Sequence, residues 1–140
     1  MNRRSLSMEL CADYSNIDIF CSKAEELMKE LELEHHIFQV QLLLREALTN
    51  AVKHGCGMNP DKIIKSRLEI TENEFIIKVM DPGPGFNWKT RESSGFHEGS
   101  LNAESGRGLV ILEKYADEYN FNEKGNEIII RKKYPKGEEL

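Results

Sequence analysis

The sequence contains few cysteines, and their number and spacing exclude two classes of small protein. Only three of the 140 residues are cysteine: Cys11, Cys21 and Cys56. An odd number of cysteines with no C-x-x-C pair predicts neither a disulfide framework nor a zinc site. We therefore expect three reduced thiols.

Long apolar runs and blocks of basic residues are also absent. The apolar runs are much shorter than the roughly 20 residues that span a bilayer, and residues 1–5 are not followed by a signal-type apolar region. Acidic residues outnumber Lys and Arg by 24 to 19, which gives a net charge of −5. We therefore expect a cytoplasmic protein that makes no contact with membranes and does not bind nucleic acid directly.

Hydrophobic periodicity predicts a single domain over residues 1–140, with strands and helices that do not alternate regularly. That order favours an α+β two-layer sandwich, in which helices cover one face of a mixed, mostly antiparallel sheet. Residues 135–140 are expected to be a frayed acidic tail. The expected elements are a strand at 4–11, a helix at 16–32 with Ser15 or Asn16 as its N-cap, a helix at 34–54, strands at 62–71 and 74–80, a helix at 107–118, and strands at 119–122 and 127–132.

The second predicted helix carries a carboxylate and an amide one turn apart, at Glu46 and Asn50. Asn lowers helix propensity, so its place inside a helix suggests a ligand role, and an amide oxygen suits Mg²⁺. Glu46 is either a solvated helix charge or a group that acts on a metal-bound water or as a general base. Lys53 and His54 continue this side as cofactor-binding candidates, or are charges near the helix end.

A glycine-rich turn carrying an aspartate follows the apolar run at 75–80. Gly83 and Gly85 alternate with prolines, which predicts either an ordinary tight turn or a stiff path along which a ligand approaches the backbone. Asp81 ends the apolar run, so we expect its carboxylate to be partly buried. A buried carboxylate needs a partner, and the amino group of adenine would serve.

A second glycine pair stands at the start of the third predicted helix, in the segment Ser105, Gly106, Arg107, Gly108 and Leu109. Glycines at a helix start expose free N–H groups at the positive end of the helix dipole, which favours phosphate. The alternative is a plain glycine N-cap. Arg107 either adds a positive charge near the phosphates or points into solvent.

The connection between the two glycine segments is long. Residues 82–105 show no apolar period over a length that compact domains tolerate mainly where the loop has a function. We expect a lid over residues 87–105 that closes on bound nucleotide. Disorder is the alternative.

Together the three segments resemble the ATP-binding boxes of the GHKL superfamily, which includes histidine kinases and gyrase. The matching patterns are Glu46-x-x-x-Asn50, Asp81-x-Gly83-x-Gly85 and Gly106-x-Gly108. Because few residues precede the first box, we expect no histidine-bearing helical hairpin ahead of it. The chain is more similar to the bacterial anti-sigma-factor serine/threonine kinases.

The resemblance implies a Bergerat-type ATPase fold with ATP and Mg²⁺ as cofactors. It implies that Asn50 ligates the metal, that Asp81 binds adenine and that Glu46 is the catalytic base. Gly83 and Gly85 would shape the base pocket, and Gly106 to Gly108 would face the phosphates. The fuller run of glycines seen in some members is replaced here at Arg107.

The resemblance further implies a homodimer that holds a sigma factor inactive and phosphorylates a Ser or Thr of a STAS-type anti-sigma-factor antagonist. A nucleotide-gated regulatory binding module without phosphotransfer would carry the same boxes. A plain α/β domain without a ligand is a third possibility.

Overall fold

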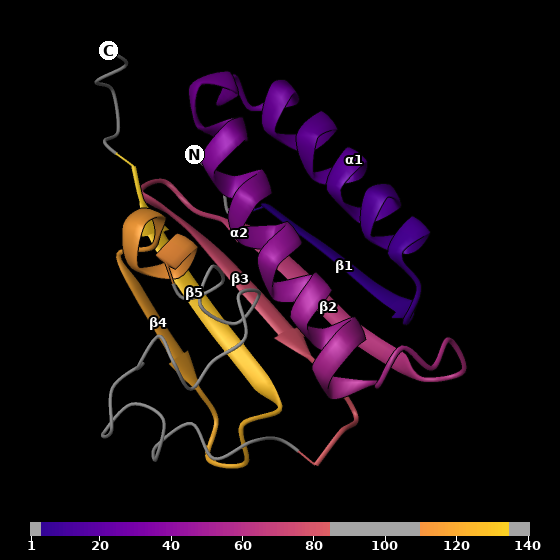
Figure 1. The fold of residues 1–140 in the computed structure, drawn as a ribbon. Coiled ribbons are helices and arrows are strands. Elements are labelled where there is room, and N and C mark those ends of the chain that lie inside the picture. Colours follow the sequence, from indigo (N-terminus) through magenta and orange to yellow (C-terminus); the bar gives the residue numbers. More distant parts are fainter. Residues whose placement is uncertain (1–3, 85–109, 135–140) are drawn as a thin grey trace.

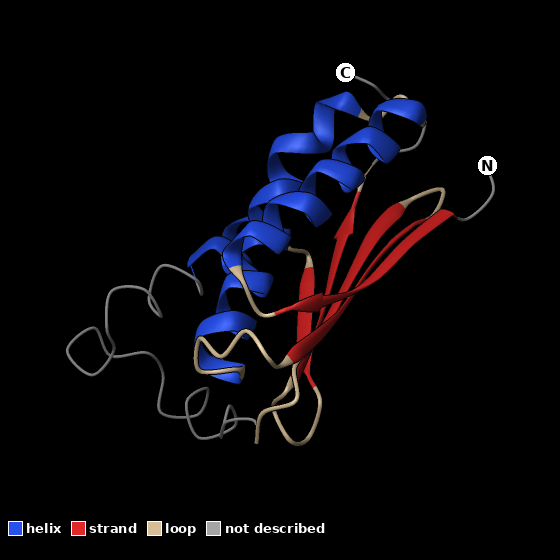
Figure 2. Cartoon of the chain, turned by 90° about the vertical axis from the view of Figure 1, so that its right-hand side faces the viewer, coloured by secondary structure: helices blue, strands red, loops and turns tan. Residues whose placement is uncertain are grey.

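The computed structural model describes residues 4–84 and 110–134, which form two layers. Figures 1 and 2 show the helices packed together on one face of a twisted sheet. The predicted lid at 87–105 and the predicted tail at 135–140 lie outside the described residues. The described part has the two-layer α+β organisation expected from the order of elements.

The sheet has five strands in the order β1-β2-β3-β5-β4. All four strand pairings within the described residues are antiparallel, which confirms the mostly antiparallel sheet. Register places Lys65 opposite Met80 and Met80 opposite Glu127. The strands are β1 (Arg4–Cys11), β2 (Ile63–Ile70), β3 (Glu74–Met80), β4 (Glu118–Phe121) and β5 (Glu127–Lys133).

Helix α1 (Tyr14–Glu30) begins earlier than expected. Its N-cap is Asp13, whereas the sequence favoured Ser15 or Asn16. The carboxylate of Asp13 accepts hydrogen bonds from the Ser15 backbone N–H at 2.8 Å and from the Ser15 hydroxyl at 2.9 Å. These bonds lower the pKa of Asp13. A charged acceptor at the positive end of a helix is favourable, so the cap falls on the aspartate.

The second predicted helix consists of three segments. A 3₁₀ turn, η1 (Glu34–His36), leads into α2 (Ile37–Asn50), which continues as a π-helical turn, η2 (Ala51–Gly55). The described part of the third predicted helix covers residues 110–115. It ends before 118, because the Asp117 N–H donates to the Arg131 carbonyl and the chain joins the sheet.

The core lies between the helix layer and the sheet, and it consists of apolar side chains from the predicted strands and helices. In β3, Phe75, Ile77 and Val79 are buried at every second position and Ile76 is buried as well, while the buried residues of α1 and α2 recur at helical spacing. The three cysteines are free, with Cys21 and Cys56 buried and Cys11 exposed, which confirms the reduced thiols. The largest fully buried side chains are Phe20, Met28, Val40, Leu43, Leu44, Leu48, Ile64, Leu68, Ile70, Phe75, Ile77 and Ile130.

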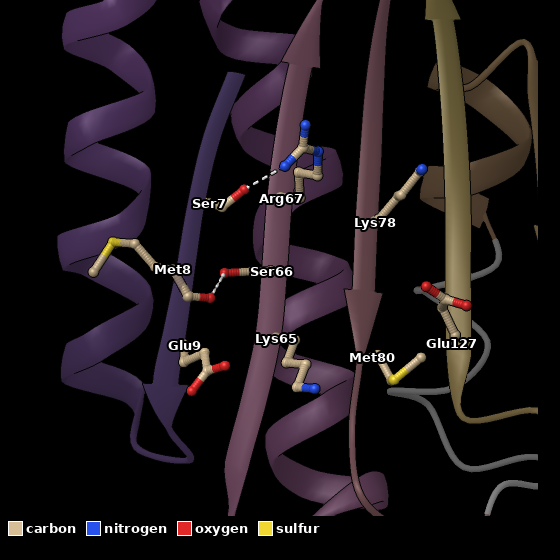
Figure 3. Close-up of a pocket in the computed structure, with 9 residues that line it drawn as sticks. All are labelled: Ser7, Met8, Glu9, Lys65, Ser66, Arg67, Lys78, Met80 and Glu127. Atoms are coloured by element: carbon tan, nitrogen blue, oxygen red, sulfur yellow. Dashed lines mark hydrogen bonds between the residues drawn. The ribbon is translucent and has the colours of Figure 1, made fainter.

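The opposite face of the sheet is covered by none of the described elements (Figure 2). It carries a shallow hollow of about 360 Å³ among charged side chains (Figure 3). Arg67 donates to the Ser7 hydroxyl at 2.8 Å and pairs with Glu69 at 2.6 Å. Charged and polar groups on this face explain why the described helices pack against only one side of the sheet.

None of the described helices is both long enough and apolar enough to cross a bilayer.

Candidate functional site

The end of α2 brings the predicted carboxylate and amide to one face of a regular helix. Glu46 and Asn50 both lie within α2, one turn apart, and both are half-buried. Directly after Asn50 the hydrogen-bond pattern widens, because the Cys56 N–H donates to the Ala51 carbonyl at 2.9 Å. Such π turns occur frequently at functional sites. The turn leads from Asn50 to Gly55.

Gly55 lies against the carboxylate of Asp81. An added Cβ on Gly55 would be 2.1 Å from Cγ of Asp81, far closer than any van der Waals contact. Gly83 is equally confined, since its Cβ would be 2.3 Å from the Gly55 carbonyl oxygen. The end of the α2 segment and the turn after β3 therefore meet without room for a side chain on either glycine.

The Asp81 carboxylate has one oxygen engaged. Oδ1 accepts a hydrogen bond from the Gly83 N–H at 2.7 Å. No hydrogen bond or ion pair to Oδ2 is found among the residues that the structure describes. A carboxylate oxygen in this setting accepts a hydrogen bond from an amino group.

Burial raises the pKa of Asp81 above its ordinary value. The hydrogen bond from Gly83 and the charges of Lys124 and Lys62 lower the pKa in part. The neighbouring thiol of Cys56 also has a raised pKa, first through burial and then through the charge of Asp81. The site therefore holds a partly desolvated acceptor, which costs folding energy unless a ligand provides a donor.

We expect Asp81→Asn to leave the melting temperature of the ligand-free protein at pH 7 unchanged or higher. A raised folded-state pKa means that the charged form destabilises the fold, fully so above both pKa values. This contribution disappears as the pH falls below the unfolded-state value, about 3.9 for Asp. Thermal unfolding at pH 7 and pH 4 tests it, with exposed Asp61→Asn as the charge-matched control. A lower melting temperature at pH 7 for Asp81→Asn than for the control would contradict the expectation.

The remaining predicted residues are placed as follows. Lys53 is half-buried and His54 is exposed, both within η2. The described helical residues 110–115 follow the second glycine pair in the chain after one intervening residue, Leu109. Gly85, Ser105, Gly106, Arg107, Gly108 and Leu109 lie outside the described residues.

Gly55 is the site residue that sequence reasoning missed. Nothing in a single sequence links Gly55 to Asp81. Its position directly after the helix bearing Asn50 was the available signal.

No group of three or more His, Cys, Asp and Glu side chains suited to a metal occurs within 4–84 and 110–134. The half-buried amide of Asn50 fits a metal site that takes few ligands from the protein. Mg²⁺ usually takes one or two protein oxygens and completes its shell with water and substrate phosphates. The side-chain oxygen of Asn50 is of that kind, and Glu46 lies one turn before it on α2.

Comparisons with known proteins show the family to which the chain belongs. The family of histidine kinase-like ATPase domains matches residues 10–132. A protein of Clostridium novyi (strain NT) named Anti-sigma F factor is 28% identical over 95% of this chain and 96% of its own length. The Anti-sigma F factor of Clostridium perfringens (strain 13 / Type A) is 26% identical over 84% of this chain and 83% of its own.

A solved structure shows the same fold. It is the histidine kinase domain of the blue-light activated histidine kinase from Erythrobacter litoralis EL346. It superposes with a TM-score of 0.51 at 15% identity, over 85% of this chain and 60% of that one. At this identity the likeness concerns the fold alone.

Proposed function

The chain belongs to the family of histidine kinase-like ATPase domains, and on this premise we propose that it is an ATP-dependent protein serine/threonine kinase. The observation that supports the proposal most is the contact of the Asp81 carboxylate with Gly55 and Gly83, at the end of the helix segment that carries Asn50. This contact brings the segment that follows Asn50 against the turn that contains Asp81 and Gly83.

In the proposed complex, Asp81 accepts a hydrogen bond from the 6-amino group of adenine. Gly83 and Gly85 let the base approach the backbone, while Gly106 to Gly108 face the phosphates. Asn50 would hold Mg²⁺, and the metal would supply positive charge that offsets the charge of the phosphates. Glu46 would take the proton of a partner's Ser or Thr hydroxyl as that oxygen attacks the γ-phosphorus, while the bond from the γ-phosphorus to the β–γ bridging oxygen breaks and ADP leaves.

The names of the relatives extend the proposal to partners. We propose that the chain, as a homodimer in the cytoplasm, sequesters a sigma factor and phosphorylates a STAS-type antagonist. Two proteins named Anti-sigma F factor that align over more than 80% of both chains support this assignment.

Asn50→Ala is expected to weaken ATP binding at least about tenfold in the presence of Mg²⁺, by analogy with losses at metal sites. The loss should vanish in EDTA, because the amide acts through the metal. Alanine is the better helix former, so the fold should not suffer. Calorimetric titration with ATP measures both conditions, with exposed Asn120→Ala as the control. An equal loss with and without Mg²⁺ would rule out a metal ligand.

Phosphotransfer is tested by incubating the protein with γ-labelled ATP and a STAS-domain antagonist. Label on a Ser or Thr of the antagonist supports the kinase. ATP-dependent complex formation without label supports the alternative, a nucleotide-gated binding module. The absence of ATP and ADP binding would refute both functions.

A further inference from the structure

The turn between β4 and β5 is built around the side chain of Asn122. Its Oδ1 accepts backbone N–H groups from Gly125 at 2.7 Å, Asn126 at 3.0 Å and Glu127 at 3.3 Å. Gly125 has a φ of 85°, a left-handed conformation that favours glycine. Asn122 Nδ2 also donates to Asn126 Oδ1 at 2.8 Å. The orientation of the Asn126 amide is therefore determined by its own turn.

Asn126 in turn holds both backbone polar groups of Asp81. The Asn126 carbonyl accepts the Asp81 N–H at 2.9 Å, and Asn126 Nδ2 donates to the Asp81 carbonyl at 2.9 Å. Strand pairing ends one residue earlier, where Met80 lies opposite Glu127. Without the side-chain amide of Asn126, the Asp81 backbone would keep only one of these two hydrogen bonds.

These contacts leave the Asp81 carboxylate little freedom to move. The backbone is held by Asn126, Oδ1 by the Gly83 N–H, and the carboxyl group lies against Gly55. A bound base is recognised by hydrogen bonds that depend on the acceptor's position to within a fraction of an ångström. The group that fixes the Asp81 backbone therefore affects recognition without touching the ligand.

We propose that Asn126 is a positioning residue for Asp81 and that the turn at residues 122–126 thereby sets the preference of the site for adenine. This inference rests on the proposed function, because it assumes that Asp81 binds the base. A carboxylate accepts a hydrogen bond from the 6-amino group of adenine and repels the 6-carbonyl oxygen of guanine. A misplaced Asp81 would therefore lose ATP affinity and ATP-over-GTP selectivity together.

The test uses Asn126→Asp, which keeps the shape and the acceptor facing Asn122 but places an oxygen against the Asp81 carbonyl. Asn120→Asp is the matched control, since it adds the same charge on an exposed residue of the same hairpin. Dissociation constants are measured for ATP, GTP and inorganic tripolyphosphate, each with Mg²⁺. Asn126→Ala, which removes the donor without adding a charge, is measured in the same way if the aspartate variant does not fold.

We expect Asn126→Asp to weaken ATP binding about tenfold and to reduce ATP-over-GTP selectivity by a similar factor. Tripolyphosphate binding should change less than about twofold, because the phosphates do not contact Asp81 in the proposed complex. In an Asp81→Asn background the substitution should lower ATP affinity no further, as expected for a residue that acts through Asp81. A purely structural role would weaken ATP and tripolyphosphate alike.

Two failures are distinguishable. If the unaltered protein binds GTP as tightly as ATP, Asp81 does not discriminate adenine from guanine. The adenine contact of the proposed function is then wrong, and so is the inference about Asn126. If the protein prefers ATP and Asp81→Asn removes the preference, yet Asn126→Asp behaves like Asn120→Asp, the inference alone is wrong.

Discussion

Replacing Glu46 by Gln is expected to lower phosphotransfer to a protein substrate by about 10²–10⁴-fold, the usual contribution of a general base. ATP affinity should change less than about twofold, since the proposed role of Glu46 is towards the hydroxyl and not the nucleotide. Glu46 is half-buried on α2, one turn before Asn50, so it lies near the metal that Asn50 is proposed to hold. Glutamine keeps the shape and removes the basic oxygen.

Single-turnover transfer from γ-labelled ATP measures the chemical step, and calorimetric titration measures binding. Glu26→Gln, on the exposed side of α1, is the matched control and should transfer phosphate at the normal rate. We propose separate roles for Glu46, as the base, and Asn50, as the metal ligand. These separate roles are wrong if Glu46→Gln and Asn50→Ala lose ATP binding equally and the transfer rate falls only in proportion to the ATP that is bound. A normal single-turnover rate for Glu46→Gln would show that Glu46 is not the general base.

Gly55→Ala is expected to reduce ATP affinity by about 10- to 10²-fold, which corresponds to the loss of one hydrogen bond to a charged group. The added Cβ would be 2.1 Å from Asp81 Cγ and 2.3 Å from Oδ2, so the carboxylate must move away. The neighbour is a side chain rather than backbone, so the fold can adjust at a cost of about 1–3 kcal/mol. We therefore expect a folded protein with a damaged base site.

Gly57→Ala is the control for Gly55→Ala. Gly57 has a φ of 60° and no atom within 4 Å of an added Cβ, so alanine there strains the backbone and contacts nothing. It should cost about 1–2 kcal/mol of stability and leave ATP binding intact. Chemical denaturation and ATP titration of both variants separate stability from binding. ATP affinity within about threefold of the unaltered protein in Gly55→Ala would contradict a base site at Asp81.

The positions of strands and helices followed from local patterns. The apolar alternation of β1, the apolar run of β3 and the helical spacing in α1 and α2 predicted elements close to those observed. The boundaries were less accurate where one side chain decides them. Asp13 caps α1 by accepting from Ser15, and the third helix ends early because Asp117 bonds to β5.

The π turn after α2 shows the limit of periodicity. Residues 51–55 belong to the predicted helix span at 34–54 almost in full, yet their hydrogen bonds skip five residues instead of four. The apolar pattern does not distinguish the two, because Ala51 and Val52 are buried in either case. Packing against the Asp81 turn accompanies this change of geometry.

By itself, the sequence determined the two-layer class, the one-turn spacing of Glu46 and Asn50, and the placement of Asp81 at a strand end. These features depend on helix and strand periods, which neighbouring residues establish. Only the tertiary structure decided that Gly55 and Asn126 lie against Asp81, which is separated from Asn126 by 45 positions in the chain. Such contacts depend on strand register and on close packing between distant segments, and no local pattern encodes them.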